Sequence, residues 1–219
     1  MTKVRIVTGF TPIPGHPRKE EEYHRLAKQF HTVHGALRTH YETPLSDCWL
    51  QQWLGKYRPV PFLVSRGDNP EKNTEAYHVV QHQKAEWLKL ATMADDDAET
   101  FIWLDYGIFH QPGVTATVIS DFLKRVRLND FALPGCAGYS REWPDTSPNW
   151  RFLGSLMIVP RQHISAFDAL VKLVTKERIR INNRLSWEVN DWARVEALSK
   201  LPIRHYEADH NETQFTNYV

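Results

Sequence analysis

The stretch Phe101-Ile102-Trp103-Leu104-Asp105-Tyr106-Gly107-Ile108 (FIWLDYGI) decides the fold. Its four leading apolar residues are typical of a strand that is buried on both faces, as in a mostly parallel sheet. Ligands of α/β proteins bind outside the carboxyl ends of the strands, so Asp105 is the first candidate functional residue. Gly107 permits a turn that leaves the Asp105 side chain at the rim of the sheet. The alternative interpretation is an acid that only turns the chain after a strand.

Strand-like and helix-like segments alternate along the rest of the chain. Strands are predicted over residues 3–8, 61–65, 101–105, 131–137, 153–159 and 203–207. Helices are predicted over residues 20–33, 45–57, 74–94, 115–126, 161–178 and 185–200. This alternation predicts an α/β fold in which helices flank a mostly parallel central sheet. We expect residues 1–219 to form a single domain.

Composition restricts the classes of partner. The 27 lysines and arginines balance 26 acids, so no excess positive charge favours nucleic acid as a partner. Only Cys48 and Cys136 are present, without a Cys-x-x-Cys motif, which fits a reducing compartment. No apolar run approaches the roughly 20 residues of a membrane-spanning helix. We therefore expect a cytoplasmic protein with no integral membrane segment and no nucleic-acid partner.

Several common catalytic motifs are absent from the sequence. It contains no phosphate-binding Gly-x-x-x-x-Gly-Lys-Ser/Thr loop, no Gly-x-Gly-x-x-Gly after the first strand, and no Gly-x-Ser-x-Gly elbow. His78 and His82 are four residues apart on a predicted helix, but the Glu of a His-Glu-x-x-His zinc motif is missing. We predict that both histidines are solvated.

A cluster of acids begins the last predicted helix, in Leu185 to Ala193 (LSWEVNDWA). Glu188 and Asp191 are three residues apart and so share one edge of that helix. They are candidates for acid–base chemistry. The alternative is that they are first-turn acids stabilised by the helix dipole.

A second polar cluster follows the last predicted strand, in Tyr206 to Glu212 (YEADHNE). A tail this short after a strand could return to the sheet edge that carries Asp105. Asp209 and His210 are then candidate partners of Asp105. The alternative is a solvated C-terminal tail.

Together these segments resemble the bacterial HtrL/WlaTC-type group of GT-A nucleotide-diphospho-sugar glycosyltransferases. The resemblance extends from Thr8-Gly9-Phe10, through Gln83-Lys84-Ala85-Glu86, to Asp209-His210-Asn211. It implies a GT-A-like fold and transfer of a sugar from a nucleoside diphosphate to an acceptor hydroxyl. GT-A enzymes bind a metal ion through an Asp-x-Asp motif and often a late histidine. By resemblance Asp105 and His210 would hold Mn²⁺ or Mg²⁺, although Gly107 replaces the second Asp.

The resemblance implies roles for the other candidates. Glu188 or Asp191 would be the general base for the acceptor hydroxyl, with Glu188 preferred because it follows Trp187. The nucleoside would border Thr8, Gly9 and Phe10, and the diphosphate would contact Arg66 and Lys84. The acceptor would face Gly154, Ser155 and the 139–150 loop. The expected substrate site also includes Tyr106, Gly107 and Trp187.

The chemical nature of the acceptor stays open at this point, whether glycan, lipid-linked or protein. Two other functions are compatible with the same residues. One is a metal-dependent nucleotidyltransferase, which would release pyrophosphate instead of a nucleoside diphosphate. The other is a sugar-nucleotide-binding module without catalysis.

Overall fold

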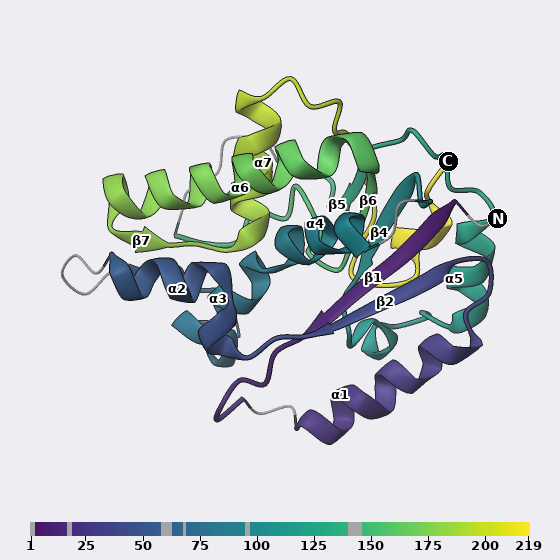
Figure 1. Ribbon diagram of the computed structural model, residues 1–219, viewed down its shortest axis with the longest axis horizontal. Helices are drawn as coiled ribbons and strands as arrows, with labels where there is room; N and C mark the ends of the chain where they lie inside the picture. Colours follow the sequence, from purple (N-terminus) through teal and green to yellow (C-terminus); the bar gives the residue numbers. More distant parts are fainter. Residues whose placement is uncertain (1–2, 17–18, 58–62, 68, 95–96, 140–145) are drawn as a thin grey trace.

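The computed structural model describes residues 3–16, 19–57, 63–67, 69–94, 97–139 and 146–219, and it shows a central sheet between layers of helices (Figure 1). The sheet has six strands in the order β2-β1-β4-β6-β5-β8. Their bounds are β1 (Val4–Phe10), β2 (Leu37–Glu42), β4 (Thr100–Leu104), β5 (Ala132–Gly135), β6 (Leu156–Pro160) and β8 (Arg204–Glu207). Within these residues β6 alone runs antiparallel to its neighbours. The predicted α/β fold with a mostly parallel central sheet is confirmed.

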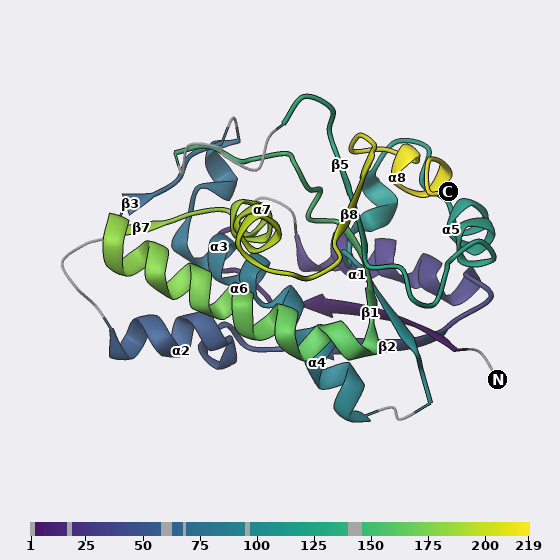
Figure 2. The ribbon, with the colours of Figure 1, turned by 90° about the horizontal axis from the view of Figure 1, so that it is seen from above.

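The central strand β4 is buried on both faces because its side chains alternate between two cores. Phe101 and Trp103 pack into one core, whereas Ile102 and Leu104 pack into the other. Side chains of α4 (Lys84–Ala94), α6 (Arg161–Asn182) and α7 (Glu188–Leu198) complete the first core. The second core is completed by α1 (Glu20–Ala27), α5 (Ala116–Leu123) and α8 (Thr213–Thr216). The two groups of helices therefore cover opposite faces of the sheet (Figure 2).

A smaller unit lies beside the carboxyl-terminal half of α6. It contains α2 (Trp49–Lys56), α3 (Glu75–His82) and a parallel pair of short strands, β3 (Leu63–Val64) and β7 (Arg184–Leu185). Asn183 ends α6 in a left-handed conformation, with φ 48°, so that the chain can turn into β7. None of the described helices, the 22-residue α6 included, is long and apolar enough to cross a membrane.

The largest differences between the structure and the predicted elements are at three places. The predicted helix over 74–94 is broken at Gln83 into α3 and α4, and the Gln83 side chain accepts a hydrogen bond from the backbone N–H of Trp49 at the start of α2 (3.0 Å). The predicted strand over 61–65 pairs in the small sheet instead of the central one. Strand β2 was not predicted, because it is a polar strand (LRTHYE) at the sheet edge without an apolar alternation.

A tryptophan pair fixes how α4 packs on the sheet. The rings of Trp87 on α4 and Trp103 on β4 are stacked, 5.4 Å apart and 8° from parallel. Trp87 lies directly on the backbone of Gly9 in β1, where an added Cβ would be 2.5 Å from its ring. Glycine is therefore required at this position by the close approach of the helix.

We expect Gly9→Ala to lower the free energy of unfolding by about 1–3 kcal/mol, because the new methyl group overlaps the Trp87 ring. Urea denaturation measures the effect. Gly55→Ala in α2 is the matched control: no atom lies within 4 Å of its Cβ position, so the change should be neutral or slightly stabilising. An unchanged midpoint for Gly9→Ala would show that Trp87 can move freely.

Candidate active site

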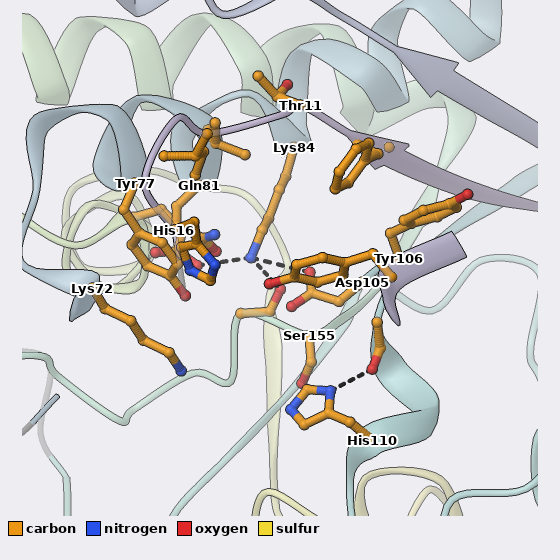
Figure 3. A pocket seen from close by; sticks show the side chains of 18 of the residues that line it. Thr11, His16, Lys72, Tyr77, Gln81, Lys84, Asp105, Tyr106, His110 and Ser155 are labelled. Carbon is orange, nitrogen blue, oxygen red and sulfur yellow. Dashed lines mark hydrogen bonds and ion pairs between the residues drawn. The ribbon is translucent and has the colours of Figure 1, made fainter. Parts of the chain in front are cut away.

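A cavity of about 580 Å³ lies where the carboxyl ends of β1 and β4 meet the starts of α4 and α7 (Figure 3). Most of the residues predicted from sequence line it. These are Gly9, Phe10, Lys84, Asp105, Tyr106, Gly107, Gly154, Ser155, Trp187, Glu188 and His210. The structure thus brings together segments from both halves of the chain at one sheet edge.

The side chain of Lys84 lines the cavity, and its ammonium group points toward Asp105 (Figure 3). Its Nζ is 2.9 Å from Oε1 of Glu188 and 3.2 Å from Oδ1 of Asp105. It also donates a hydrogen bond to the carbonyl oxygen of Gly154 (2.9 Å). Lys84 is only 3% exposed and Glu188 only 2%, so this ion pair is shielded from water.

This arrangement keeps the buried partners charged. Burial opposes the charge on Lys84, but Asp105 and Glu188 outweigh it and raise the pKa of the ammonium above its ordinary value. Burial likewise opposes ionisation of Glu188, but the Lys84 charge and hydrogen bond outweigh it and hold the pKa of this carboxyl below its ordinary value. At neutral pH the site therefore contains the Lys84 ammonium ion paired with the ionised carboxylate of Glu188.

Gly154 makes room for this contact. A Cβ on Gly154 would lie 2.2 Å from Oε1 of Glu188 and 3.0 Å from Nζ of Lys84. The segment before β6 can approach the ion pair only because this residue has no side chain.

Asp105 directly follows β4, and its orientation is fixed from two directions. Its backbone N–H donates to the carbonyl of Ser155 (3.0 Å), which ties the end of β4 to the start of β6. The indole Nε1 of Trp103 donates to Oδ1 (2.8 Å). Oδ2 has no hydrogen-bond partner among the described residues, and the side chain is 32% exposed. This oxygen is available to a ligand in the cavity.

Asp191 is placed differently from Glu188, although both are in the first turn of α7. It does not line the cavity, and its side chain is fully buried between α3 and α6. Its carboxylate contacts Nε2 of His82 (2.8 Å), the hydroxyl of Thr175 (2.6 Å) and the guanidinium of Arg178 (3.0 Å). Burial raises the pKa of Asp191, but Arg178 and these partners outweigh it and lower the pKa below its usual range.

Two other predicted residues also lie outside the cavity lining. Thr8 is buried in β1, one residue before the part of the strand that reaches the cavity. Arg66 lines a separate hollow with Arg184 and Thr146, and its backbone N–H donates to the carbonyl of Thr146. The structure brings neither side chain to Lys84.

The prediction that His78 and His82 are solvated is wrong. Both are buried in the contact between α3 and α7, where His82 pairs with Asp191 and the His78 ring packs on Trp187 (5.1 Å between centroids). Burial, followed by the neighbouring His82, lowers the pKa of His78 to about 4, so it is neutral at pH 7.

The sequence reasoning missed several residues that line the cavity. Tyr77 and Gln81 precede Lys84 by seven and three residues, a helical spacing that could have placed them on its face. His16 ends the Pro-Gly loop after β1, and Lys72 is the last residue of the short turn before α3 (Pro70–Lys72). Trp150 comes from the loop predicted to face the acceptor; of that loop, residues 140–145 lie outside the described residues.

Asp105 and His210 both line the cavity and are close enough to interact electrostatically. Burial and Lys72 lower the pKa of His210, against a smaller opposite effect of Asp209 and Asp105, so the imidazole is neutral at pH 7. A neutral imidazole is the form that binds metal ions. No three His, Cys, Asp or Glu side chains of the described residues gather closely enough to hold a metal ion without other ligands.

No protein-family model and no curated protein sequence matches this chain. Among solved structures it is similar to a glycosyltransferase involved in the glycosylation of the major capsid of PBCV-1. The TM-score is 0.51 at 15% sequence identity, and the similarity covers 94% of this chain and 81% of that one. The chain therefore has an α/β fold that it shares with a glycosyltransferase.

Proposed function

We propose that this chain is a glycosyltransferase that moves a sugar from a nucleoside-diphosphate sugar to an acceptor hydroxyl. The observation that carries the proposal is the Lys84 ion pair with Asp105 and Glu188, in a cavity at the carboxyl edge of a glycosyltransferase-like sheet. The volume of the cavity, about 580 Å³, is in the range of small-molecule binding sites. The sequence motifs that resemble the HtrL/WlaTC-type group lie around this same cavity, which supports a place in or near that group.

The charge of the side chains that line the cavity favours a divalent cation as cofactor. Among the described residues that line the cavity, three are lysines and five are acids, so it does not by itself offset a diphosphate. Mg²⁺ typically binds through one or two carboxylates and completes its shell with substrate phosphates. The free Oδ2 of Asp105 and the neutral His210 fit such a site, and the imidazole favours Mn²⁺. When bound, the ion would act as a Lewis acid that stabilises the departing diphosphate.

Lys84 positions Asp105 and Glu188 in the proposed reaction. Lys84 is paired both with Asp105, the acid proposed to bind the donor, and with Glu188. These two ion pairs keep the acids at a fixed separation. The positive charge of Lys84 also contributes to the potential felt by the diphosphate. The nucleoside would lie on the β1 side of Lys84, near Gly9 and Phe10.

Glu188 is the proposed general base. It is ionised, it lines the cavity, and it can take the proton of the acceptor hydroxyl while that oxygen bonds to the anomeric carbon. The bond from the anomeric carbon to the phosphate oxygen breaks, and the nucleoside diphosphate leaves with those electrons. Asp191 would instead hold α7 in place through Arg178 and His82.

Nucleoside diphosphates should raise the melting temperature, and Mn²⁺ should increase that shift if Asp105 contributes to a metal site. A ligand at about 100 times its dissociation constant adds about 2.7 kcal/mol of stability. Thermal-shift assays with UDP, GDP, ADP and CDP, in Mn²⁺ and in EDTA, measure both effects. Asp105→Asn should abolish the Mn²⁺ increment.

Asp121→Asn is the matched control for Asp105→Asn, because Asp121 is an exposed acid on α5 paired with Lys124 outside the cavity. It should keep the full Mn²⁺ increment. Equal nucleotide affinity in Mn²⁺ and EDTA would contradict the metal role. Release of pyrophosphate from a nucleotide-sugar synthesis reaction would instead favour a nucleotidyltransferase.

Replacing the two acids of α7 should have separable effects. Glu188→Gln keeps the shape of the side chain, and we expect transfer to fall by about 10²- to 10⁴-fold with little change in nucleotide binding. Asp191→Asn should lower stability by about 3–5 kcal/mol because the buried Arg178 loses its charged partner. Initial rates at saturating donor, with urea denaturation of each variant, measure both.

Transfer at the parental rate by Glu188→Gln would remove Glu188 as the base. Loss of transfer in a well-folded Asp191→Asn protein, with Glu188→Gln fully active, would assign the base to Asp191. If both variants are active, a retaining mechanism, in which the departing diphosphate assists the hydroxyl, becomes the better account.

A further inference from the structure

We infer that the acceptor is a carbohydrate whose ring binds against Trp150, beside Glu188. This inference rests on the proposed function and names its second substrate. The surface concerned, called here the acceptor wall, is formed by Gln111, Trp150, Ser155, Trp187, Glu188 and His210.

The acceptor wall is separate from the part of the cavity formed by β1. Figure 3 shows Ser155 and His110 on the side of the Lys84 ammonium that faces away from Thr11. Glu188 contacts Lys84 from the start of α7, so the proposed base borders this second region. A nucleoside bound near β1 would leave the acceptor wall free for the other substrate.

Aromatic rings make up the apolar part of the wall. Trp150 packs edge-to-face on Trp187 (6.0 Å between centroids) and on His210 (4.7 Å). Trp187 is in turn held by Tyr77 (5.6 Å) and His78. The C–H face of a sugar ring is a flat apolar surface, and rigid aromatic side chains with polar neighbours suit such a ligand.

Two buried polar atoms of this wall have no partner. Nε1 of Trp187 and Oε2 of Glu188 are both inaccessible to water and make no hydrogen bond with any described residue. One is a donor and the other an acceptor, and they belong to adjacent residues. A hydroxyl group both donates and accepts, but it can reach these two atoms only if the Trp187 or Glu188 side chain moves, because both atoms are closed to solvent.

The remaining polar groups are neutral and held in place. Ser155 donates to Oε1 of the buried Gln214, and Nε2 of Gln214 donates to Oε1 of Gln111. Amides and hydroxyls are suitable partners for sugar hydroxyls. These neutral groups favour a saccharide as the acceptor.

A glycan array with uncharged oligosaccharides, serine and threonine peptides and immobilised phosphomonoesters tests the inference. The parent protein should bind saccharide spots, and Trp150→Leu should weaken this binding on the order of tenfold because it removes the ring face. Trp150→Phe should retain most of it. Trp53→Leu on α2, at a half-buried tryptophan outside the cavity, should leave it unchanged.

Nucleoside diphosphate thermal shifts on the same proteins separate this inference from the proposed function. Saccharide binding that depends on Trp150 supports the inferred acceptor site. This holds even if no nucleoside diphosphate binds, a result that would contradict the proposed function alone. Binding to peptides or phosphomonoesters alone, no binding to any spot, or saccharide binding unaffected by Trp150→Leu in a folded variant would overturn it, whatever the nucleotide result.

Discussion

The ion pair of Lys84 with Asp105 and Glu188 joins three elements that are far apart in the sequence: α4, the end of β4 and the start of α7. An ammonium ion taken out of water is costly unless charged partners surround it closely. Lys84 can therefore be buried only when β4 and α7 are both docked against α4. Docking of β4 and α7 against α4 surrounds the Lys84 charge with its partners and at the same time forms this part of the cavity. Folding and assembly of the site therefore depend on the same ion pair.

Close approach of backbone and side chains makes that geometry possible. Gly154 lets the segment before β6 reach the ion pair, and Gly9 lets the Trp87 ring rest on β1. Trp87 stacks on Trp103, which in turn donates to Asp105. An aromatic layer between α4 and the sheet thus orients the carboxylate that the proposed donor needs.

Glu188 and Asp191 show how neighbouring positions on one helix acquire different properties. Glu188 faces the cavity and a single cation, and one of its oxygens has no partner. Asp191, three residues on, faces α3 and α6, where His82, Thr175 and Arg178 contact its carboxylate. Both acids are ionised, but only the first is next to the space that a substrate can enter. Helix spacing cannot distinguish them, because the difference comes from what packs on each side.

The sequence by itself determined what local patterns encode: the buried strand that ends at Asp105, the alternation of strands and helices, and the acids at the start of α7. Apolar periodicity carries that information over a few residues. It gave no signal for the polar edge strand β2, the burial of His82 or the position of Arg66 away from the cavity. Only the tertiary structure decided that Lys84 is a buried ion between two carboxylates and that Asp191 is a partner of Arg178 and His82. Those properties arise from contacts across as many as 109 residues of chain, where burial and charge pairing, not local periodicity, set the energy.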